Sequence, residues 1–472
     1  MSTKTSVKKN FALTSAAQIL GNMLTLITSP YISRILGAEG IGIYSYNSSI
    51  AAYFVSFAML GLNNYGNRTI AKVKGDKNQL SKMFCEIYVM QLGFAVLVSG
   101  IYLIYVISAS VSVVAAILFF YVASSAIDIN WFFYGMELFK MTVTRNLVVR
   151  VLSVLCVFIF VKSESDVYLY VMIITASTVV SHLALWPYLK RYIILRPVGI
   201  RDICSHVKPN IILFIPAVAV SIYKLMDKVM LGAMSSMTQA GYYENSEKLI
   251  QIPIVLVTSL GTVMLPRMSN LVEMKAHDSE DRYMRKSFGL VMFLSTSMSF
   301  GIMAVADTFV PVYYGAGYEE CIGLLQILMP CCIFIAFANV IRTQLLIPKQ
   351  MDKIYIQSVS LGAVMNVVLN LFWIGRFQAF GVCLATLITE FSVCLYQAIK
   401  VRSIIDIRKY VLISVPFFMA GIIMYVVVLN LHFPEISQVA ELIIRVLIGC
   451  VIYIVACSLL NLKHIYRFCR CR

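Results

Sequence analysis

Three charged residues lie close together in one apolar segment of the chain, residues 209–233. Lys224, Asp227 and Lys228 are spaced as i, i+3 and i+4, so they share one face if the segment is a helix. A charged side chain in apolar surroundings is costly unless it faces water, an opposite charge or a polar interface. Two lysines and one aspartate leave a surplus of positive charge, which is typical of a site that binds an anion. All three are therefore candidate substrate-binding residues.

A second apolar segment, residues 11–33, carries a polar stripe and ends beside another cation, Arg34. The stripe residues, spaced by four, three, four and four positions, are Gln18, Asn22, Thr25, Ser29 and Ser33. These spacings place them on one face of a helix. The stripe predicts either one wall of a water-filled cavity or interhelical hydrogen bonds in a dry bundle. In the first case Gln18 and Asn22 are candidate substrate contacts.

Arg34 occupies nearly the same place in its segment as Lys228 does in the other. If the two segments face each other, cations from both walls converge on the outer part of a cavity. Arginine can bind two phosphate oxygens at once and lysine acts as a point charge, so the ligand that fits is an anion such as a lipid-linked pyrophosphate. The alternative is that Arg34 and Lys228 extend to the outer lipid headgroups, while Asp227 pairs with Lys224.

About fourteen long apolar segments run through the chain, and most are near the ~20 residues that a bilayer requires. They lie roughly at 11–33, 41–62, 84–107, 111–133, 146–161, 167–189, 209–233, 246–266, 288–312, 322–345, 353–373, 379–399, 410–430 and 439–461. With 60% apolar residues, 13% charged residues and a mean hydropathy of +0.83, the composition excludes an ordinary soluble protein. We expect an all-α integral membrane protein.

Most of the 39 lysines and arginines fall in the two termini and in every second loop. Because basic residues remain on the cytoplasmic side during insertion, we expect an even number of spans and both termini in the cytoplasm. The net charge of +16 lies in short loops beside the membrane, where it attracts anionic headgroups. Membrane lipids are therefore expected partners, and nucleic acid is not.

The residue types needed for catalysis or for a metal site do not occur in suitable arrangements. The 12 cysteines follow neither a disulfide framework nor a metal-ligand spacing, so we expect no metal and no bound cofactor. The P-loop pattern GxxxxGK[ST] is absent, as are Ser-His-Asp, Cys-His and paired-carboxylate arrangements that would suit hydrolysis. The chain is therefore not expected to be an enzyme or to use ATP by itself.

A weak internal repeat relates the two halves at an offset near 200 residues. RILG at 34–37, followed by GIY at 42–44, matches DKVMLG at 227–232, followed by GYY at 241–243. Six spans separate the matching segments, so both halves enter the membrane in the same direction, as a parallel repeat. A substrate site between the halves is the expected consequence.

The repeat predicts two six-helix lobes, residues 1–208 and 209–402, followed by an accessory pair of transmembrane helices at 403–472. The last two apolar segments have no counterpart in the repeat, which is why they are assigned to the accessory pair. With twelve spans in the lobes and two in the pair, the prediction is about fourteen transmembrane helices.

Other ionisable residues inside the apolar segments are weaker candidates. Glu390, in the middle of its segment, is the best single carboxylate for coupling to an ion, either a proton or sodium, and structural pairing with a neighbouring helix suits it equally well. His182 is expected to be a hydrogen-bonded packing residue rather than a proton relay, and Asp128 to lie near the interface. Glu441 and Arg445, spaced as i and i+4, are expected to satisfy each other.

The chain resembles the polysaccharide transporter family, the Wzx-type oligosaccharide flippases of the MATE-like MOP superfamily. Four stretches carry the resemblance: SPYISRILGAEGIGIYSY at 29–46, AIDINWFFYGMELFK at 126–140, MDKVMLGAMSSMTQAGYYENSEKL at 226–249 and LGTVMLPRMSNL at 260–271. Together with the length and number of segments, they extend the resemblance over nearly the whole chain. They are motifs of fold and family rather than a catalytic signature.

The resemblance implies a MATE-like fold and a multi-pass protein of the bacterial cytoplasmic membrane. It implies a flippase that carries undecaprenyl-diphosphate-linked oligosaccharide repeat units to the outer leaflet by alternating access, for O-antigen or capsule synthesis. The substrate would be the partner, and a polysaccharide polymerase is a further candidate. On this interpretation Arg34, Lys224 and Lys228 face the substrate.

Two alternative functions remain open at this stage. A lipid II flippase suits fourteen spans and cavity cations equally well. A MATE-type cation or drug antiporter is the other alternative, although multidrug exporters of that type often use a carboxylate in the first span. Here the first carboxylate is Glu39, in the loop after that span, which weakens the antiporter interpretation.

Overall fold

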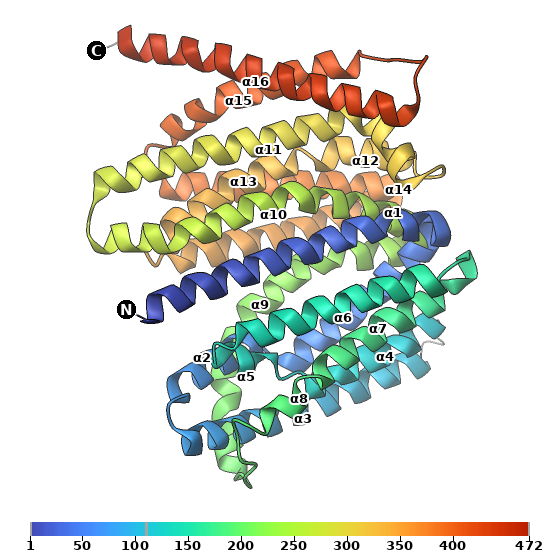
Figure 1. The fold of residues 1–472 in the computed structure, drawn as a ribbon, viewed down its shortest axis with the longest axis vertical. Helices are drawn as coiled ribbons and strands as arrows, with labels where there is room; N and C mark the ends of the chain where they lie inside the picture. The colour runs from blue at the N-terminus through green and yellow to red at the C-terminus, as the bar shows by residue number, and fades with distance from the viewer. Residues whose placement is uncertain (1, 109–111, 471–472) are drawn as a thin grey trace. The chain divides into compact units, whose positions relative to one another are not determined.

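The computed structural model describes residues 2–108 and 112–470, which are almost entirely helical (Figure 1). Within these ranges, some side chains lie outside the described part, namely those of 2–19, 22, 215–217, 219–220, 222–224 and 461–470. The chain divides into two compact units, residues 1–241 and 242–472. The lobe boundaries inferred from the repeat, at 208/209 and 402/403, stay a prediction.

The first unit contains nine helices and two short 3-10 turns among its described residues, besides the start of α10. They are α1 (Ser2–Met59), α2 (Leu62–Val73), α3 (Lys77–Ser108), α4 (Val113–Ala123), η1 (Ser124–Ile127), α5 (Asn130–Gly135), α6 (Phe139–Phe160), η2 (Glu164–Asp166), α7 (Val167–Leu183), α8 (Trp186–Leu189) and α9 (Ile200–Met234). Within this unit α1 packs against α3, α4, α6 and α9, and α7 packs against both α4 and α6. Figure 1 shows α4, α6 and α7 side by side.

The second unit contains most of α10 and all the later helices. They are α10 (Met237–Glu273), α11 (His277–Tyr314), α12 (Glu320–Leu328), α13 (Cys331–Ile341), η3 (Arg342–Leu346), α14 (Asp352–Val401), α15 (Ile407–Leu429) and α16 (Gln438–Arg470). The predicted accessory helices are α15 and α16, which pack against α11 (Figure 1). Of these, α15 buries Tyr410 and Met424 in a core shared with Phe288 of α11.

Ten helical stretches in the described residues are long and apolar enough to cross a membrane, as expected for a multi-pass protein. One of them, α14, has 50 residues and leaves helical geometry at Gln378. At ~1.5 Å per residue it is about two and a half times as long as a ~30 Å hydrocarbon core requires, so it holds both predicted segments, 353–373 and 379–399. The total of about fourteen spans stays a prediction.

The first helix also contains a break, at Gly37, which has φ 67° and ψ 174°. An L-residue with a side chain rarely adopts this backbone conformation, whereas glycine does so readily. The break falls between the predicted segments at 11–33 and 41–62. The RILG motif at 34–37 therefore ends the first of the two helical pieces of α1.

A tight aromatic core holds together the part of the first unit formed by α3 and α5. Trp131 and Phe132 of α5 are fully buried, and the ring of Phe84 in α3 lies 5.5 Å from that of Trp131. The Trp131 indole N–H donates to Oε1 of Gln91 at 2.9 Å, so its one polar group is satisfied. The NWFFYG stretch therefore anchors a short helix inside the bundle.

Candidate functional site

The structure locates four of the seven predicted site residues. Asp227 is buried, Lys228 and Glu390 are half-buried, and Arg34 is exposed. Tyr53 of α1 lies within electrostatic reach of Asp227. The side chains of the other three predicted residues lie outside the described part; they are Gln18, Asn22 and Lys224. Substrate binding by all six cavity candidates, and ion coupling by Glu390, stay predictions.

The polar stripe of α1 faces the interior of the first unit. Ser29 and Ser33 are buried, and the Ser33 hydroxyl donates to the Ser29 carbonyl at 2.8 Å. Thr25, one turn earlier, accepts a hydrogen bond from Arg150 of α6. At 3.6 residues per turn, Arg34 lies on the opposite side of α1, in line with exposed Ile27. The stripe and Arg34 therefore face different directions.

Arg150 is a membrane-depth cation that the charge pattern did not single out. It lies in the middle of α6, on the side opposite exposed Leu152 and Ile159 and so away from the apolar face that suits lipid. Its guanidinium passes over Gly21 of α1, where an added Cβ would lie 2.7 Å from Nη1. The available signal was its position inside a predicted segment, where an arginine needs a polar environment.

A second polar cluster surrounds the interruption between α4 and α5. Oδ1 of Asp128 accepts hydrogen bonds from the backbone N–H of Asn130 at 2.9 Å and from its side-chain Nδ2 at 2.6 Å. Arg145 of α6 donates to Oδ1 of Asn130 at 2.9 Å and to the carbonyl of Ser181 at 2.7 Å. His182 of α7 lies with Nε2 at 3.7 Å from Oδ2 of Asp128. The interruption is thus lined by an anion, a cation and an imidazole.

A third polar group lies where α2, α3 and α9 meet. The Tyr65 hydroxyl is 2.6 Å from Nδ1 of His206, and Nε2 of His206 is 2.9 Å from Oε2 of Glu86. Lys82 forms an ion pair with Oε1 of the same glutamate at 3.5 Å. The sequence carries no local signal for this group, because its members come from three helices and are far apart in the chain.

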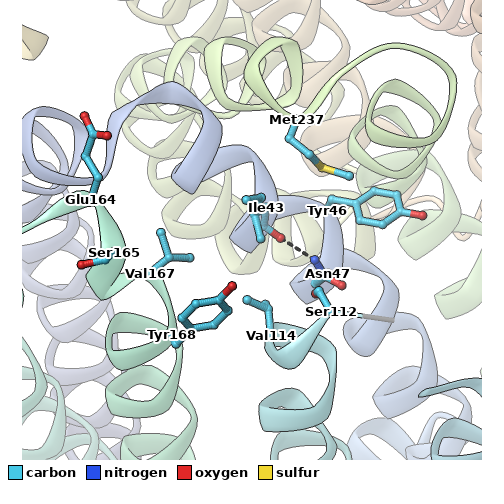
Figure 2. Close-up of a pocket in the computed structure, with 10 residues that line it drawn as sticks. All are labelled: Ile43, Tyr46, Asn47, Ser112, Val114, Glu164, Ser165, Val167, Tyr168 and Met237. Atoms are coloured by element: carbon cyan, nitrogen blue, oxygen red, sulfur yellow. Dashed lines mark hydrogen bonds between the residues drawn. The ribbon is translucent and has the colours of Figure 1, made fainter. Parts of the chain in front are cut away.

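A pocket of about 420 Å³ opens in the first unit (Figure 2). Its lining residues are Ile43, Tyr46, Asn47, Ser112, Val114, Glu164, Ser165, Val167, Tyr168 and Met237. The Tyr168 hydroxyl points into the pocket, and the Asn47 amide is oriented by donation to the Ile43 carbonyl at 2.7 Å. The lining holds one carboxylate, Glu164, and no lysine or arginine, so it suits the hydroxyl groups of a sugar better than phosphate.

Beside this pocket, two glycines of the internal repeat meet within the first unit. A Cβ on Gly42 would lie 1.7 Å from the carbonyl oxygen of Met237, and a Cβ on Gly241 would lie 1.8 Å from the carbonyl oxygen of Ala38. Only glycine permits an approach this close. The GIY and GYY motifs are therefore matched in space as well as in sequence.

In the part of the chain that the structure describes, no group of three or more His, Cys, Asp or Glu side chains is placed to hold a metal ion.

Glu390, the candidate coupling carboxylate, lies within electrostatic reach of Cys331 and Cys394.

Comparison with known proteins agrees with the family expected from the motifs. The chain is 21% identical over 410 residues to a protein of Escherichia coli (strain K12) described as "Putative O-antigen transporter", a match that covers 85% of this chain and 98% of the relative. A protein of Shigella dysenteriae with the same description is 21% identical over 407 residues, covering 84% of this chain and all of the relative.

Solved structures with the same fold include two kinds of membrane transporter. The lipid II flippase MurJ in an inward closed conformation has a TM-score of 0.74 at 14% identity and matches 96% of this chain and 99% of that one. An inward-facing multidrug resistance MATE transporter of the MOP superfamily has a TM-score of 0.57 at 13% identity, over 82% of this chain and 98% of that one. The predicted MATE-like transporter fold is therefore confirmed.

The family profile described as "Polysaccharide biosynthesis protein" matches residues 7–272, more than half of the chain. The matched region includes the RILG, NWFFYG and GYY motifs and all of the first unit from residue 7 onward. The chain therefore belongs to the polysaccharide biosynthesis protein family.

Proposed function

We propose that this protein is a flippase that moves oligosaccharides linked to a polyprenyl diphosphate, with undecaprenol as the carrier, from the cytoplasmic to the outer leaflet of the bacterial cytoplasmic membrane. Transport by alternating access requires no bond to be made or broken, so the protein acts as a transporter and not as an enzyme. Both termini lie in the cytoplasm, and the exported units serve O-antigen or capsule synthesis. A polysaccharide polymerase is the partner expected to receive them.

The observation that carries this proposal is the position of Arg150. The diphosphate is the most strongly charged part of the substrate and has to cross the membrane interior. Arg150 places a guanidinium at membrane depth, away from the apolar face of α6 and against the polar stripe of α1. Because a guanidinium has five N–H donors, it can bind Thr25 and still donate to phosphate oxygens.

The resemblance to O-antigen transporters supports the oligosaccharide part of the proposal. The pocket in Figure 2 adds a site for neutral polar groups, lined by Tyr168 and Asn47. A substrate with a charged diphosphate and a neutral sugar chain needs both kinds of surface. The chain thus offers a cationic contact for one part of the substrate and an uncharged polar contact for the other.

The test is complementation of a deletion strain of the producing bacterium. The wild-type gene should restore surface polysaccharide and remove the accumulated lipid-linked oligosaccharide. A charge-assisted hydrogen bond contributes about 1.5–3 kcal/mol, roughly a tenfold or larger change in binding, so Arg150→Ala should lower export at least about tenfold and Arg150→Lys should restore part of it. Arg201→Ala, which removes an arginine in the first turn of α9, is the matched control. Normal polymer in Arg150→Ala cells at equal protein level would contradict the proposal.

A lipid II flippase is the second candidate, favoured by the fold shared with MurJ. Depletion of the host's lipid II flippase separates the two functions. A lipid II flippase would sustain growth under depletion, whereas an oligosaccharide flippase would restore only the surface polymer.

A further inference from the structure

Three side chains hold the interruption between α4 and α5 in place by binding its backbone carbonyls. The amide of Gln91 donates to Ser125 at 2.6 Å and to Asp128 at 2.8 Å, and the indole of Trp186 donates to Ile127 at 2.9 Å. The imidazole of His182 contacts the carbonyl of Ser124, with Nδ1 at 3.2 Å. Of these three, only the histidine changes charge near neutral pH.

Both ring nitrogens of His182 face groups that accept hydrogen bonds. A backbone carbonyl can only accept, so the contact with Ser124 places a proton on Nδ1. Nε2 faces Oδ2 of Asp128 at 3.7 Å, and an ionised carboxylate also only accepts. A neutral ring would turn its lone pair toward that carboxylate. One additional proton converts the contact into an attractive imidazolium–carboxylate pair.

The surroundings of His182 favour that additional proton. The ring lies in the last turn of α7, where the negative end of the helix dipole stabilises a cation. The two side chains of the pair are mostly buried, with exposed fractions of 15% for His182 and 16% for Asp128, so water screens their interaction less than it would at the surface.

The other charged and titratable groups around the pair are few. Arg145 of α6 reaches it through Asn130, whose side chain binds both Asp128 and the guanidinium. Tyr121 of α4 and Tyr134 of α5 lie within electrostatic reach of Asp128. With neutral tyrosines, the aspartate and the arginine balance each other, so proton binding makes the cluster positive by one charge.

His206 provides an internal comparison because its hydrogen bonds are complete without an added proton. Its Nε2 can donate to Glu86 at 2.9 Å, and its Nδ1 can accept from the Tyr65 hydroxyl at 2.6 Å, since a hydroxyl both donates and accepts. A neutral ring therefore satisfies both contacts at His206. The two histidines differ in what their second nitrogen faces.

We propose that Asp128 and His182 form a proton-binding site at this interruption, and that binding and release of the proton accompany each transport cycle. The protonated pair ties α7 to the interrupted helix through both ring nitrogens. Loss of the proton removes the attraction at Nε2 and loosens that connection. The inference rests on the proposed function only for its second part, the link to transport.

The first experiment measures proton binding without any substrate. The chain contains five histidines, so histidine-labelled protein in detergent gives few NMR signals, and the His182 signal is identified by its loss in His182→Gln. We expect this signal to change with pH in the wild type, and the change to differ in Asp128→Asn. A signal that does not respond to pH, or a response that is the same in Asp128→Asn, would overturn the proton site.

The second experiment measures the link to transport in inverted membrane vesicles from the producing bacterium, which contain its own lipid-linked oligosaccharide. The initial rate at which this lipid reaches the lumenal leaflet is measured over the same pH range. We expect His182→Gln and Asp128→Asn to flatten the pH dependence at least threefold relative to wild type. A wild-type pH profile in both variants would overturn the link.

Two control variants separate protonation from packing. Trp186→Phe removes a hydrogen bond to the same interruption but no titratable group, and His206→Gln removes a histidine elsewhere. Both should retain the wild-type pH profile even if the rate falls. If Trp186→Phe flattens the profile as His182→Gln does, the pair acts by packing and the proposal fails. If wild-type vesicles move no lipid-linked oligosaccharide, the proposed function fails, and the NMR titration still decides the proton site.

Discussion

Nε2 of His206 lies 2.9 Å from Oε2 of Glu86, joining the start of α9 to α3 in the first unit. Both side chains are almost completely buried, with exposed fractions of 7% and 2%. The Tyr65 hydroxyl binds the other ring nitrogen, so α2 is part of the same connection. Since α9 also carries Asp227, this group fixes one end of a helix that holds a candidate substrate-binding residue.

Removal of the Glu86 carboxylate should destabilise the first unit. Glu86→Ala leaves the buried Nε2–H of His206 without its acceptor, a loss of about 1–3 kcal/mol, and we expect a lower melting temperature in detergent. Glu86→Gln keeps an acceptor and should lose less. Asp202→Ala, which removes a half-exposed carboxylate that also faces Lys82, is the matched control. Equal melting temperatures for wild type and Glu86→Ala would show that the pair is not a stabilising contact.

The fold could largely be predicted from the sequence because its two main signals are strong. Apolar segments of membrane length indicate an all-α membrane protein, and family motifs such as that at 126–140 indicate the superfamily. The repeat itself stays a prediction, although two of its glycines, Gly42 and Gly241, approach each other closely. These signals depend on residue type and spacing alone.

The polar sites were less predictable because they depend on contacts between distant residues. The sequence gives no sign of the partner of Arg150, which is Thr25, 125 positions away. His182 was expected to be a packing residue, and its position opposite Asp128 is visible only after α4, α5 and α7 are assembled. The spacing of residues within one helix does not predict which polar side chains of another helix will contact it.

The expected pairing of Glu441 with Arg445 captured only part of that contact. Arg445 lies 3.8 Å from Glu441, but it binds Asp307 of α11 at 3.0 Å and the Ala304 carbonyl at 2.8 Å. The sequence spacing of i and i+4 indicated the weaker partner. The stronger one comes from a neighbouring helix 138 positions away.

Arg445 should therefore control the docking of α16 on α11. Its side chain is fully buried, while Asp307 is 40% exposed. Arg445→Ala removes every hydrogen bond of the guanidinium and leaves a cavity. Water can solvate the exposed Asp307 carboxylate, so we expect a loss of about 1.5–3 kcal/mol of stability, the contribution of a hydrogen bond to a charged group. We expect faster proteolysis of the loop between α15 and α16.

Two further variants test this explanation. Arg445→Lys keeps the charge and should restore part of the protection, whereas Arg408→Ala changes an arginine at the start of α15 and should leave proteolysis unchanged. Protection of the loop in Arg445→Ala equal to that in wild type would mean that apolar contacts alone dock α16.

Alanine at either repeat glycine should disrupt the contact between the two motifs. The added Cβ of Gly42→Ala would lie 1.7 Å from a backbone oxygen, and a backbone atom cannot move aside as a flexible side chain can. We expect little folded protein from Gly42→Ala or Gly241→Ala, measured as the monodisperse fraction after detergent extraction. Gly93→Ala and Gly289→Ala introduce the same methyl group where nothing lies within 4 Å and should behave as wild type. Normal yield from the first pair would show that the two helices can separate at no cost.

Gly21 offers a way to displace Arg150 without removing its charge. A Cβ at residue 21 would lie 2.7 Å from Nη1 of Arg150, and the flexible end of an arginine can shift. Gly21→Ala should therefore lower export less than Arg150→Ala does. The double variant should export as much as Arg150→Ala alone, because two neighbouring substitutions that act through the same group do not have additive effects. Export is measured as surface polysaccharide at matched protein level, with Gly289→Ala as control. An additive loss in the double variant would mean that Gly21 serves the transport path independently of Arg150.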